Sequence, residues 1–279
     1  MPVAKVNGVD LYYEETGTGF PLVWSHEFGG DSRSWEPQVR YFSRRYRVIA
    51  YNHRGYPPSA VPKDGAAYSN DILVEDLYQL LRHLGIRQAH VGGLSMGANV
   101  ALNFGLAHPD MARSLIIAAC GSGSTTRQEW LPRQAALADA LDRDGIDALV
   151  RNMSELPARR IFREKDPRGW AEFLRGVGEH SGPACAHLIR GVMTKRKTIM
   201  ELGPRLRELT IPTLVMIGDQ DTPCVEPALF MQKTMPRAGL VTLPMSGHTI
   251  NIEEPALFNR HVAEFLAAVE NGRWGLTPA

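Results

Sequence analysis

The chain of 279 residues contains little cysteine and almost no net charge. Its three cysteines, Cys120, Cys185 and Cys224, are odd in number and far apart. This spacing argues against a disulfide framework or a zinc site and is typical of reduced thiols, so we expect a cytoplasmic protein. The formal net charge is +1, and no run of Lys or Arg is interleaved with aromatic residues. We therefore expect no nucleic-acid partner.

Long apolar runs are also missing. No stretch approaches the roughly 18 residues that a membrane span requires, so we expect no membrane partner. The first 15 residues contain neither a basic leader nor an apolar stretch, which argues against a signal peptide. With 44% hydrophobic residues, the chain is long enough to bury a sizeable core. The composition therefore predicts a globular protein built as one large domain with an insertion.

Short apolar runs that alternate with helical patterns are what the sequence does contain. Residues 3–15 alternate apolar and polar side chains around Asn7-Gly8, which predicts a β-hairpin. The predicted buried strands are Phe20–Ser25, Arg47–Tyr51, Ala89–Gly93, Ser114–Ala119, Thr213–Ile217 and Gly239–Leu243. The predicted helices are Ser34–Arg44, Asp71–Leu84 with Asn70 as its N-cap, Ala98–Ala107, Pro227–Met235 and Pro255–Val269. This alternation predicts an α/β fold, a mostly parallel sheet with helices on both faces.

The stretch 124–207 departs from this alternation. It shows helical periodicities without a convincing strand, at Trp130–Leu141, Ile146–Met153, Trp170–Val177 and Ala184–Met193. We interpret residues 124–207 as an inserted helical cap, and residues 1–123 and 208–279 as the core domain. The insertion holds 16 Lys and Arg against 11 Asp and Glu. It is therefore basic, whereas the remainder of the chain is acidic.

The sequence Gly93-Leu94-Ser95-Met96-Gly97 lies between a predicted strand and a predicted helix and fits the pattern GxSxG. In this pattern the serine occupies a sharp turn that lifts its hydroxyl clear of the sheet edge. The backbone of such a turn is strained, and the two glycines avoid a clash as strand and helix approach each other. Ser95 is therefore the predicted nucleophile.

A serine hydroxyl needs a base within hydrogen-bond reach, and the base needs a third group to orient it. Asp219 and Asp221 follow one of the later predicted strands, and His248 follows the next. The carboxyl ends of parallel strands lie on one edge of a sheet, so these residues can converge on Ser95. The residues alone leave open which aspartate is the acid.

Taken together, these motifs resemble those of the α/β-hydrolase superfamily. The resemblance extends to His26–Gly30 after the strand Phe20–Ser25, to Arg54-Gly55, and to Gly247-His248 followed by Glu253-Glu254-Pro255. It implies a sheet of about eight strands with an inserted helical cap, and no cofactor.

The resemblance also assigns site residues. It favours Asp221 as the acid, since the family's aspartate stands three residues after the loop glycine, here Gly218. It implies that the backbone amides of Met96 and Phe28 form the oxyanion hole. His26 is expected to be structural, and the scattered Cys and His residues show no metal-ligand spacing, so we expect no metal.

Three positions depart from the family's pattern. Glu27 stands where relatives commonly have glycine, and we consider two interpretations of it. Its carboxylate either turns to solvent or pairs with Arg54 or Arg33, or it is directed at the substrate. Asn52 and Pro57 replace an aspartate and a glycine of a loop that borders the site.

Candidate substrate-binding residues come from both predicted domains. Arg159, Arg160 and Arg163 in the insertion could bind a carboxylate through bidentate pairs, and the alternative is a solvated helix face. Trp35 is a candidate pocket residue, and the alternative is a core tryptophan. Glu27 completes this group under its substrate-directed interpretation.

The resemblance implies a serine hydrolase that cleaves a carboxylic ester or lactone through an acyl-enzyme. One alternative is a C–C bond or amide hydrolase that acts on a carboxylate intermediate of aromatic or heterocycle breakdown. The other is a ligand-binding receptor without catalysis. The expected partner is a small-molecule substrate, and the basic insertion suits an anion. The sequence defines neither the substrate nor the oligomeric state.

Overall fold

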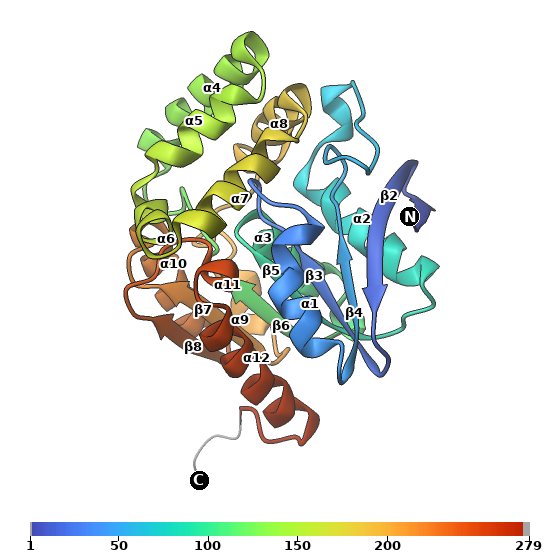
Figure 1. Ribbon diagram of the computed structural model, residues 1–279. Helices are drawn as coiled ribbons and strands as arrows, with labels where there is room; N and C mark the ends of the chain where they lie inside the picture. Colours follow the sequence, from blue (N-terminus) through green and yellow to red (C-terminus); the bar gives the residue numbers. More distant parts are fainter. Residues whose placement is uncertain (1, 276–279) are drawn as a thin grey trace.

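A single sheet of eight strands organises the molecule, as the computed structural model of residues 2–275 shows (Figure 1). The strands are β1 Val3–Val6, β2 Val9–Thr16, β3 Phe20–Ser25, β4 Tyr46–Tyr51, β5 Ala89–Leu94, β6 Ala112–Ala118, β7 Thr213–Gly218 and β8 Ala238–Leu243. Their order across the sheet is β1-β2-β4-β3-β5-β6-β7-β8. β1 and β2 are antiparallel to their neighbours, and the other pairs are parallel. The predicted mostly parallel sheet of about eight strands is confirmed.

The strands form where the sequence pattern places them. Asn7 and Gly8 both have positive φ, 47° and 75°, as a type I′ hairpin turn requires. Every residue of β5 and of β7 is buried. Strands covered on both faces need continuous apolar or small residues, which explains why β5 and β7 do not alternate apolar and polar residues.

Helices cover both faces of the sheet. In Figure 1, α1 and α12 lie in front of the sheet, and α2 and α3 lie behind it. The helices that follow core strands are α1 Glu36–Phe42, α2 Asn70–His83, α3 Met96–Ala107, α10 Thr222–Thr234, α11 Ile250–Glu253 and α12 Pro255–Glu270. The short helix α9 Gly203–Glu208 instead precedes β7 and begins inside the stretch 124–207. No helix in the described part of the chain has the length and apolar character needed to cross a membrane.

Several predicted helix starts differ from the observed ones, and two of the differences have a clear physical reason. Ser69, not Asn70, caps α2, because its hydroxyl accepts a hydrogen bond from the Ile72 amide at 3.1 Å. Both residue types are good caps, and their neighbouring positions made the prediction miss by one residue. Pro227 lies inside α10 instead of starting it, since the helix begins earlier with Pro223 in its first turn. A proline is tolerated in the first turn, because the N–H that it lacks would have no carbonyl partner within the helix.

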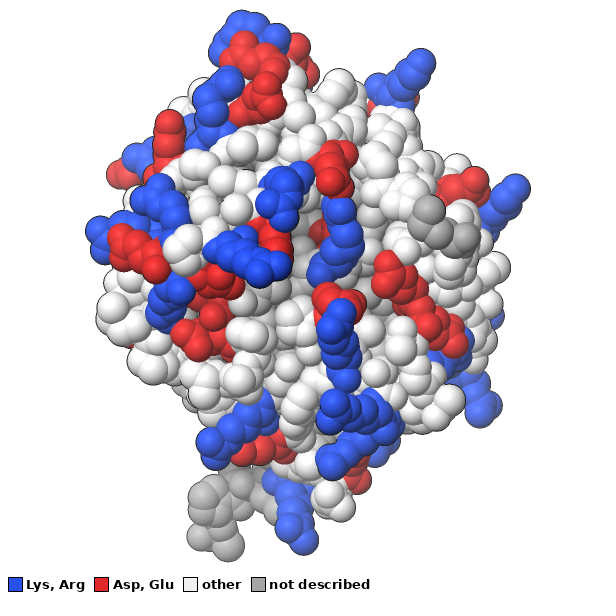
Figure 2. Space-filling model, viewed as in Figure 1, with Lys and Arg blue, Asp and Glu red and all other residues white. Residues whose placement is uncertain are grey.

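We call residues 124–207 the helical segment, because none of these described residues lies in a strand. Figure 1 shows it stacked over one end of the sheet. Its elements are α4 Arg127–Asp144, α5 Asp147–Glu155, a 3-10 turn η4 Pro157–Arg159, α6 Arg160–Lys165, α7 Pro167–Gly178, α8 Gly182–Leu188 and a π turn η5 Ile189–Met193. On the face shown in Figure 2, acidic and basic side chains lie beside one another. The basic excess of the segment thus does not form a separate cationic area on that face.

Candidate active site

Ser95 occupies a sharp turn between β5 and α3. Its φ of 53° and ψ of −109° are unfavourable for any residue with a side chain, and its amide donates to the Ala118 carbonyl at 2.9 Å. A Cβ atom added to Gly93 would lie 2.4 Å from the backbone of Gly97. One added to Gly97 would lie 2.0 Å from the Ser25 carbonyl oxygen. Only glycine fits at either position, so these two residues are what allow the turn.

His248 and Asp221 form a buried pair at the carboxyl edge of the sheet. His248 Nδ1 lies 2.7 Å from Asp221 Oδ2, and both residues are buried. An ionised carboxylate only accepts hydrogen bonds, so Nδ1 donates and Nε2 is left to accept a proton. Asp219 is more exposed and instead accepts from the Ser246 amide at 3.3 Å. The structure therefore brings Asp221, and not Asp219, to His248.

Ser95 lies on the same edge as this pair. Cys224 joins this pair to the loop that follows β6, because its Sγ lies 3.6 Å from the carbonyl of Ala119. Its sulfur and ligand atoms of Asp221 and His248 lie within 4.8 Å of one another. Within residues 2–275, no hydrogen bond joins the Ser95 hydroxyl to His248. Catalytic hydrogen bonds are often long in a free enzyme and shorten when substrate binds.

The cluster of Asp221, Cys224 and His248 has the residue types of a metal site, but its chemistry does not fit one. Burial first, and then the nearby Asp221 charge, raise the pKa of the Cys224 thiol well above its ordinary value. A protonated thiol is a poor metal ligand. The Asp221 carboxylate is moreover used by His248. The pair of Asp221 and His248 is therefore better suited to proton transfer than to holding a metal.

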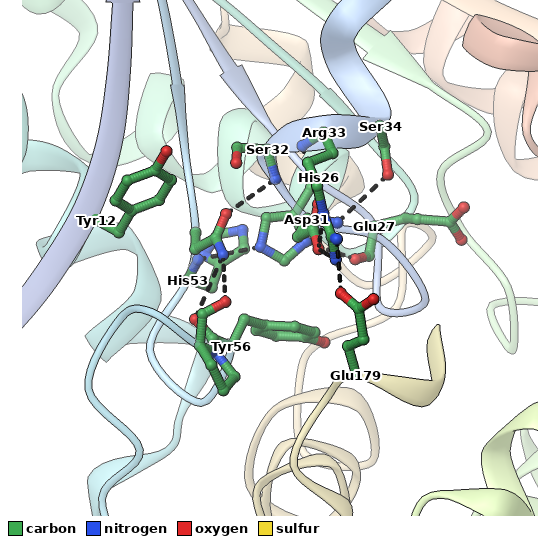
Figure 3. A network of polar contacts seen from close by, with 12 residues as sticks. Tyr12, His26, Glu27, Asp31, Ser32, Arg33, Ser34, His53, Tyr56 and Glu179 are labelled. Atoms are coloured by element: carbon green, nitrogen blue, oxygen red, sulfur yellow. Dashed lines mark hydrogen bonds and ion pairs between the residues drawn. The ribbon is translucent and has the colours of Figure 1, made fainter. Parts of the chain in front are cut away.

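His26 fixes the loop after β3, which Figure 3 shows from close by. Its Nε2 accepts from the His53 amide at 3.0 Å, so Nδ1 carries the proton and donates to the Glu27 carbonyl at 2.7 Å. Burial lowers the pKa of His26 to about 4, so the ring is neutral at pH 7. As the sequence suggested, the ring bonds to nearby backbone.

Two backbone amides, those of Phe28 and Met96, are the predicted donors to a developing oxyanion. The Phe28 carbonyl accepts from the Tyr56 hydroxyl at 2.8 Å, which fixes the loop, while the Phe28 amide forms no hydrogen bond within residues 2–275. Met96 is the first residue of α3, and the first amides of a helix have no intrahelical acceptor. Such donors stabilise a tetrahedral intermediate when they converge on its oxygen.

Glu27, beside this loop, is fully buried against Arg159 of the helical segment. Their side chains are 1% and 3% exposed. The Arg159 guanidinium contacts both Glu27 oxygens, donates to the Thr249 hydroxyl at 3.1 Å and lies 4.9 Å from the centre of the Phe173 ring. Burial alone would raise the pKa of Glu27, but the charge and hydrogen bonds of Arg159 outweigh it and keep this pKa below its usual value.

This pairing corrects the expectation for Glu27, which does not turn to solvent. Nor does it pair with Arg54 or Arg33, because each of these has another partner. Arg54 binds Asp76, and Arg33 binds Asp31 and Glu179, as Figure 3 shows for the latter set. Glu27 and Arg159 are 132 positions apart, and no sequence signal connects them.

The turn η4 also touches the loop that carries the histidine. The His248 amide donates to the Ala158 carbonyl at 2.9 Å. A Cβ atom at Gly247 would lie 2.1 Å from the same carbonyl oxygen. One turn of the helical segment therefore contacts the loop of His248 through Ala158 and the loop after β3 through Arg159.

The remaining predicted substrate residues lie elsewhere. Arg160 and Arg163 are exposed, as expected of a solvated helix face. Trp35 is fully buried and stacks on Trp24, with 4.5 Å between ring centres, so it belongs to the core.

Asn52, which departs from the family's pattern, supports the loop in a way that needs an amide. Its Oδ1 accepts from the Ser32 amide at 2.9 Å, and its Nδ2 donates to the Pro57 carbonyl at 2.8 Å. An aspartate could accept the first bond but could not donate the second. The two departures, Asn52 and Pro57, are therefore partners of each other.

Comparisons with known proteins agree with this geometry. Residues 21–255 match the family model described as alpha/beta hydrolase fold. An enol-lactonase structure from Burkholderia xenovorans LB400 is 26% identical and has a TM-score of 0.84, over 95% of this chain and 100% of that one. A thermophilic esterase from Thermogutta terrifontis, solved with malate bound, is 26% identical with a TM-score of 0.86, over 96% and 99%. A protein of Azorhizobium caulinodans, provisionally named a carbamate hydrolase, is 27% identical over 97% of this chain and 100% of its own length.

Proposed function

The chain belongs to the α/β-hydrolase family, and on that premise we propose that it is a serine hydrolase of carboxylic esters or lactones. Ser95 would be the nucleophile, His248 the general base and acid, and Asp221 the residue that orients the histidine. The observation that carries the proposal is the buried His248–Asp221 contact of 2.7 Å on the sheet edge that holds the strained Ser95 turn.

In the first half of the reaction, His248 Nε2 takes the Ser95 proton as the serine oxygen attacks the substrate carbonyl. The amides of Met96 and Phe28 bind the oxyanion of the tetrahedral intermediate. The protonated His248 then gives its proton to the departing alkoxide, and the acyl group stays on Ser95. Asp221 stabilises the charged imidazole throughout.

In the second half, His248 removes a proton from water, which attacks the acyl-enzyme. Collapse of the second intermediate returns the proton to Ser95 and releases the carboxylic acid. Because Glu27 carries a negative charge beside the oxyanion loop, its pairing with Arg159 keeps that charge from opposing the intermediate.

Labelling with a fluorophosphonate probe tests the proposal directly. We expect Ser95 to be modified in the folded wild-type protein and not in Ser95→Ala, and p-nitrophenyl butyrate hydrolysis to fall by at least about 10⁴-fold in the variant. Failure to label Ser95 in folded protein would overturn the proposal and would favour a ligand-binding role.

Amide or carbamate cleavage is the second candidate, and it is favoured by the name of the Azorhizobium caulinodans relative. The same residues could act on such bonds, since His248 can protonate a leaving nitrogen. Comparing matched butyryl esters and butyryl anilides separates the two. A higher kcat/KM for the anilide would place this protein with the amide hydrolases.

A further inference from the structure

Three arginine side chains are buried in the described chain, at Arg54, Arg159 and Arg196. Arg54 pairs with Asp76, and Arg159 pairs with Glu27. Arg196 is 9% exposed, forms no ion pair within residues 2–275, and has an Nη1 atom without a hydrogen-bond partner there. A buried charge without a partner is costly, so Arg196 is the buried arginine that lacks an anion.

The groups around Arg196 do not neutralise it. The ionisable neighbours that act on its guanidinium are the thiols of Cys120 and Cys224 and the cation Arg127. Burial raises the pKa of Cys120 to about 11 and that of Cys224 well above its ordinary value, so both thiols are neutral at pH 7. An arginine stays protonated in proteins, so the site keeps a positive charge.

The two thiols that act on Arg196 belong to the edge of the sheet that holds the proposed catalytic residues. Cys120 lies in the loop after β6, the strand whose last residue binds the Ser95 amide. Cys224 Sγ lies within 4.8 Å of ligand atoms of Asp221 and of His248. The segment that carries Arg196 lies beside the loop that follows β6, because the Ile199 amide donates to the Ser124 hydroxyl at 3.1 Å.

The backbone that carries Arg196 is fixed from two directions. Its amide donates to the Val192 carbonyl in the π turn η5 at 3.0 Å. Arg127 donates from Nη2 to the carbonyls of Thr194 and Arg196. Turns of this π type often occur at functional sites. The backbone at Arg196 is thus held in place before any ligand binds.

A cationic cavity opens next to this backbone. It has a volume of about 330 Å³ and is lined by Arg127, Lys195, Arg196 and Lys197, with Glu201 as its one acidic residue. The Glu201 carboxylate is engaged by the amide and hydroxyl of Thr198, at 2.7 and 2.8 Å. The balance of charge in this cavity favours an anion.

We propose that Arg196 binds the carboxylate of an anionic substrate whose reacting ester or lactone carbonyl reaches Ser95. The substrate class is the half-ester, or the carboxylate-bearing lactone, of a dicarboxylic acid. A guanidinium suits this ligand because it forms two parallel hydrogen bonds to one carboxylate. The inference rests on the proposed function, since it names the substrate of that same site.

The hydrolysis experiment compares anionic and neutral esters of matched length. The anionic series is the monomethyl esters of succinic, glutaric and adipic acids, and the neutral series is methyl butanoate, pentanoate and hexanoate. Acetoxyacetate places the carboxylate on the alcohol side instead. We expect the best anionic ester to exceed its neutral counterpart in kcat/KM, and Arg196→Met to lower that ratio by about 100-fold. Arg196→Lys should lower it less, because it retains the charge but loses the second hydrogen bond.

Arg168→Met is the matched control, because it removes one cation from an exposed position of the same helical segment, where the side chain is 89% exposed. It should leave the ratio unchanged. No anionic preference in the wild type would overturn the inference. So would an Arg196→Met variant that loses both series equally and melts at a lower temperature, since that pattern indicates a structural arginine.

A binding measurement distinguishes failure of this inference from failure of the proposed function. Succinate, glutarate and adipate are titrated calorimetrically into Ser95→Ala and into Ser95→Ala/Arg196→Met. We expect at least one dicarboxylate to bind the first protein and to bind the second at least about 30-fold more weakly. This result requires no turnover. Equal binding to both proteins would overturn the role of Arg196 even if esters are cleaved, and absence of binding to either would do the same.

Discussion

The helical segment contains two buried arginines in opposite states. Arg159 has a buried carboxylate partner in Glu27, whereas Arg196 has no acid within the described residues. Both emerge from short turns and not from the long helices. The difference teaches that burial of a cation does not by itself identify a binding site. The presence or absence of a counter-charge separates a structural arginine from one that is open to a ligand.

Substitution of the acid should have the largest effect, and it should not depend on the helical segment at all. We expect Asp221→Asn to lower kcat by about 10⁴-fold for charged and neutral esters alike, because His248 loses the carboxylate that orients it and stabilises its charge. Asp219→Asn is the matched control and should change kcat by less than about fivefold. Steady-state kinetics checks both. The reverse order of effects would reassign the acid.

The next effect tests the structural side of the comparison. Arg159→Met leaves Glu27 buried without a partner, and we expect a loss of roughly 3–5 kcal/mol in the free energy of unfolding. The double variant Arg159→Met/Glu27→Gln should recover much of this loss. Urea denaturation followed by circular dichroism provides the measurement. If Arg196→Met instead were the more destabilising single change, Arg196 would be the structural arginine and Arg159 the candidate for ligand binding.

As the pH falls, the free energy of unfolding should decrease first through the buried histidines of the core. The pair of Glu27 and Arg159 should lose its contribution only at lower pH. Burial lowers the pKa of His26 and of His90 from 6.5 to about 4, so between these values the unfolded chain binds more protons than the folded one. Stability should therefore be constant above pH 6.5 and fall as the pH drops toward 4, by up to roughly 3 kcal/mol for each histidine. The pKa of Glu27 lies below its ordinary value, so its contribution is lost only at lower pH. Urea titrations at pH 7.5, 6, 5 and 4.5 check this, and a flat profile would contradict it.

The smallest effects are expected for the exposed arginines that the sequence proposed for substrate binding. Arg160→Met and Arg163→Met should each change the free energy of unfolding by no more than about 0.5 kcal/mol. They should also leave the ratio of anionic to neutral ester hydrolysis within about twofold of wild type. A large drop in that ratio for either variant would return the anion site to α6.

The positions of the proposed catalytic residues on one sheet edge could be predicted, because they depend on local sequence patterns. Ser95, Asp221 and His248 each follow a strand that its own apolar residues define, and parallel strands bring such positions to one edge. The residue types at Asn7-Gly8 and the glycines around Ser95 likewise predict the local backbone conformation. Where neighbouring residues compete for the same position, as Ser69 and Asn70 do, the pattern locates the helix but not its first residue.

The contacts of the helical segment could not be predicted, because they join residues far apart in the chain. Arg159 and Arg160 are adjacent and identical in type, yet one is buried and the other is exposed. Arg196 stands between two exposed lysines, and such a basic run usually indicates a solvated surface. A sequence pattern reports which face a helix buries, but short turns such as η4 have no periodicity to read. Only the folded contacts distinguish these side chains.

The hydrogen bond from His248 to Ala158 has a consequence for protein engineering. Exchanging the inserted segment of an α/β-hydrolase is a way to seek a new substrate specificity while the core residues stay the same. Here the helical segment itself supports the histidine loop, because the Ala158 carbonyl anchors that loop and its oxygen leaves room only for glycine at position 247. A library of variants that exchanges residues 124–207 should therefore keep residues 157–159 unchanged. If position 247 is randomised while residues 157–159 are retained, selection for folded protein should recover only glycine there.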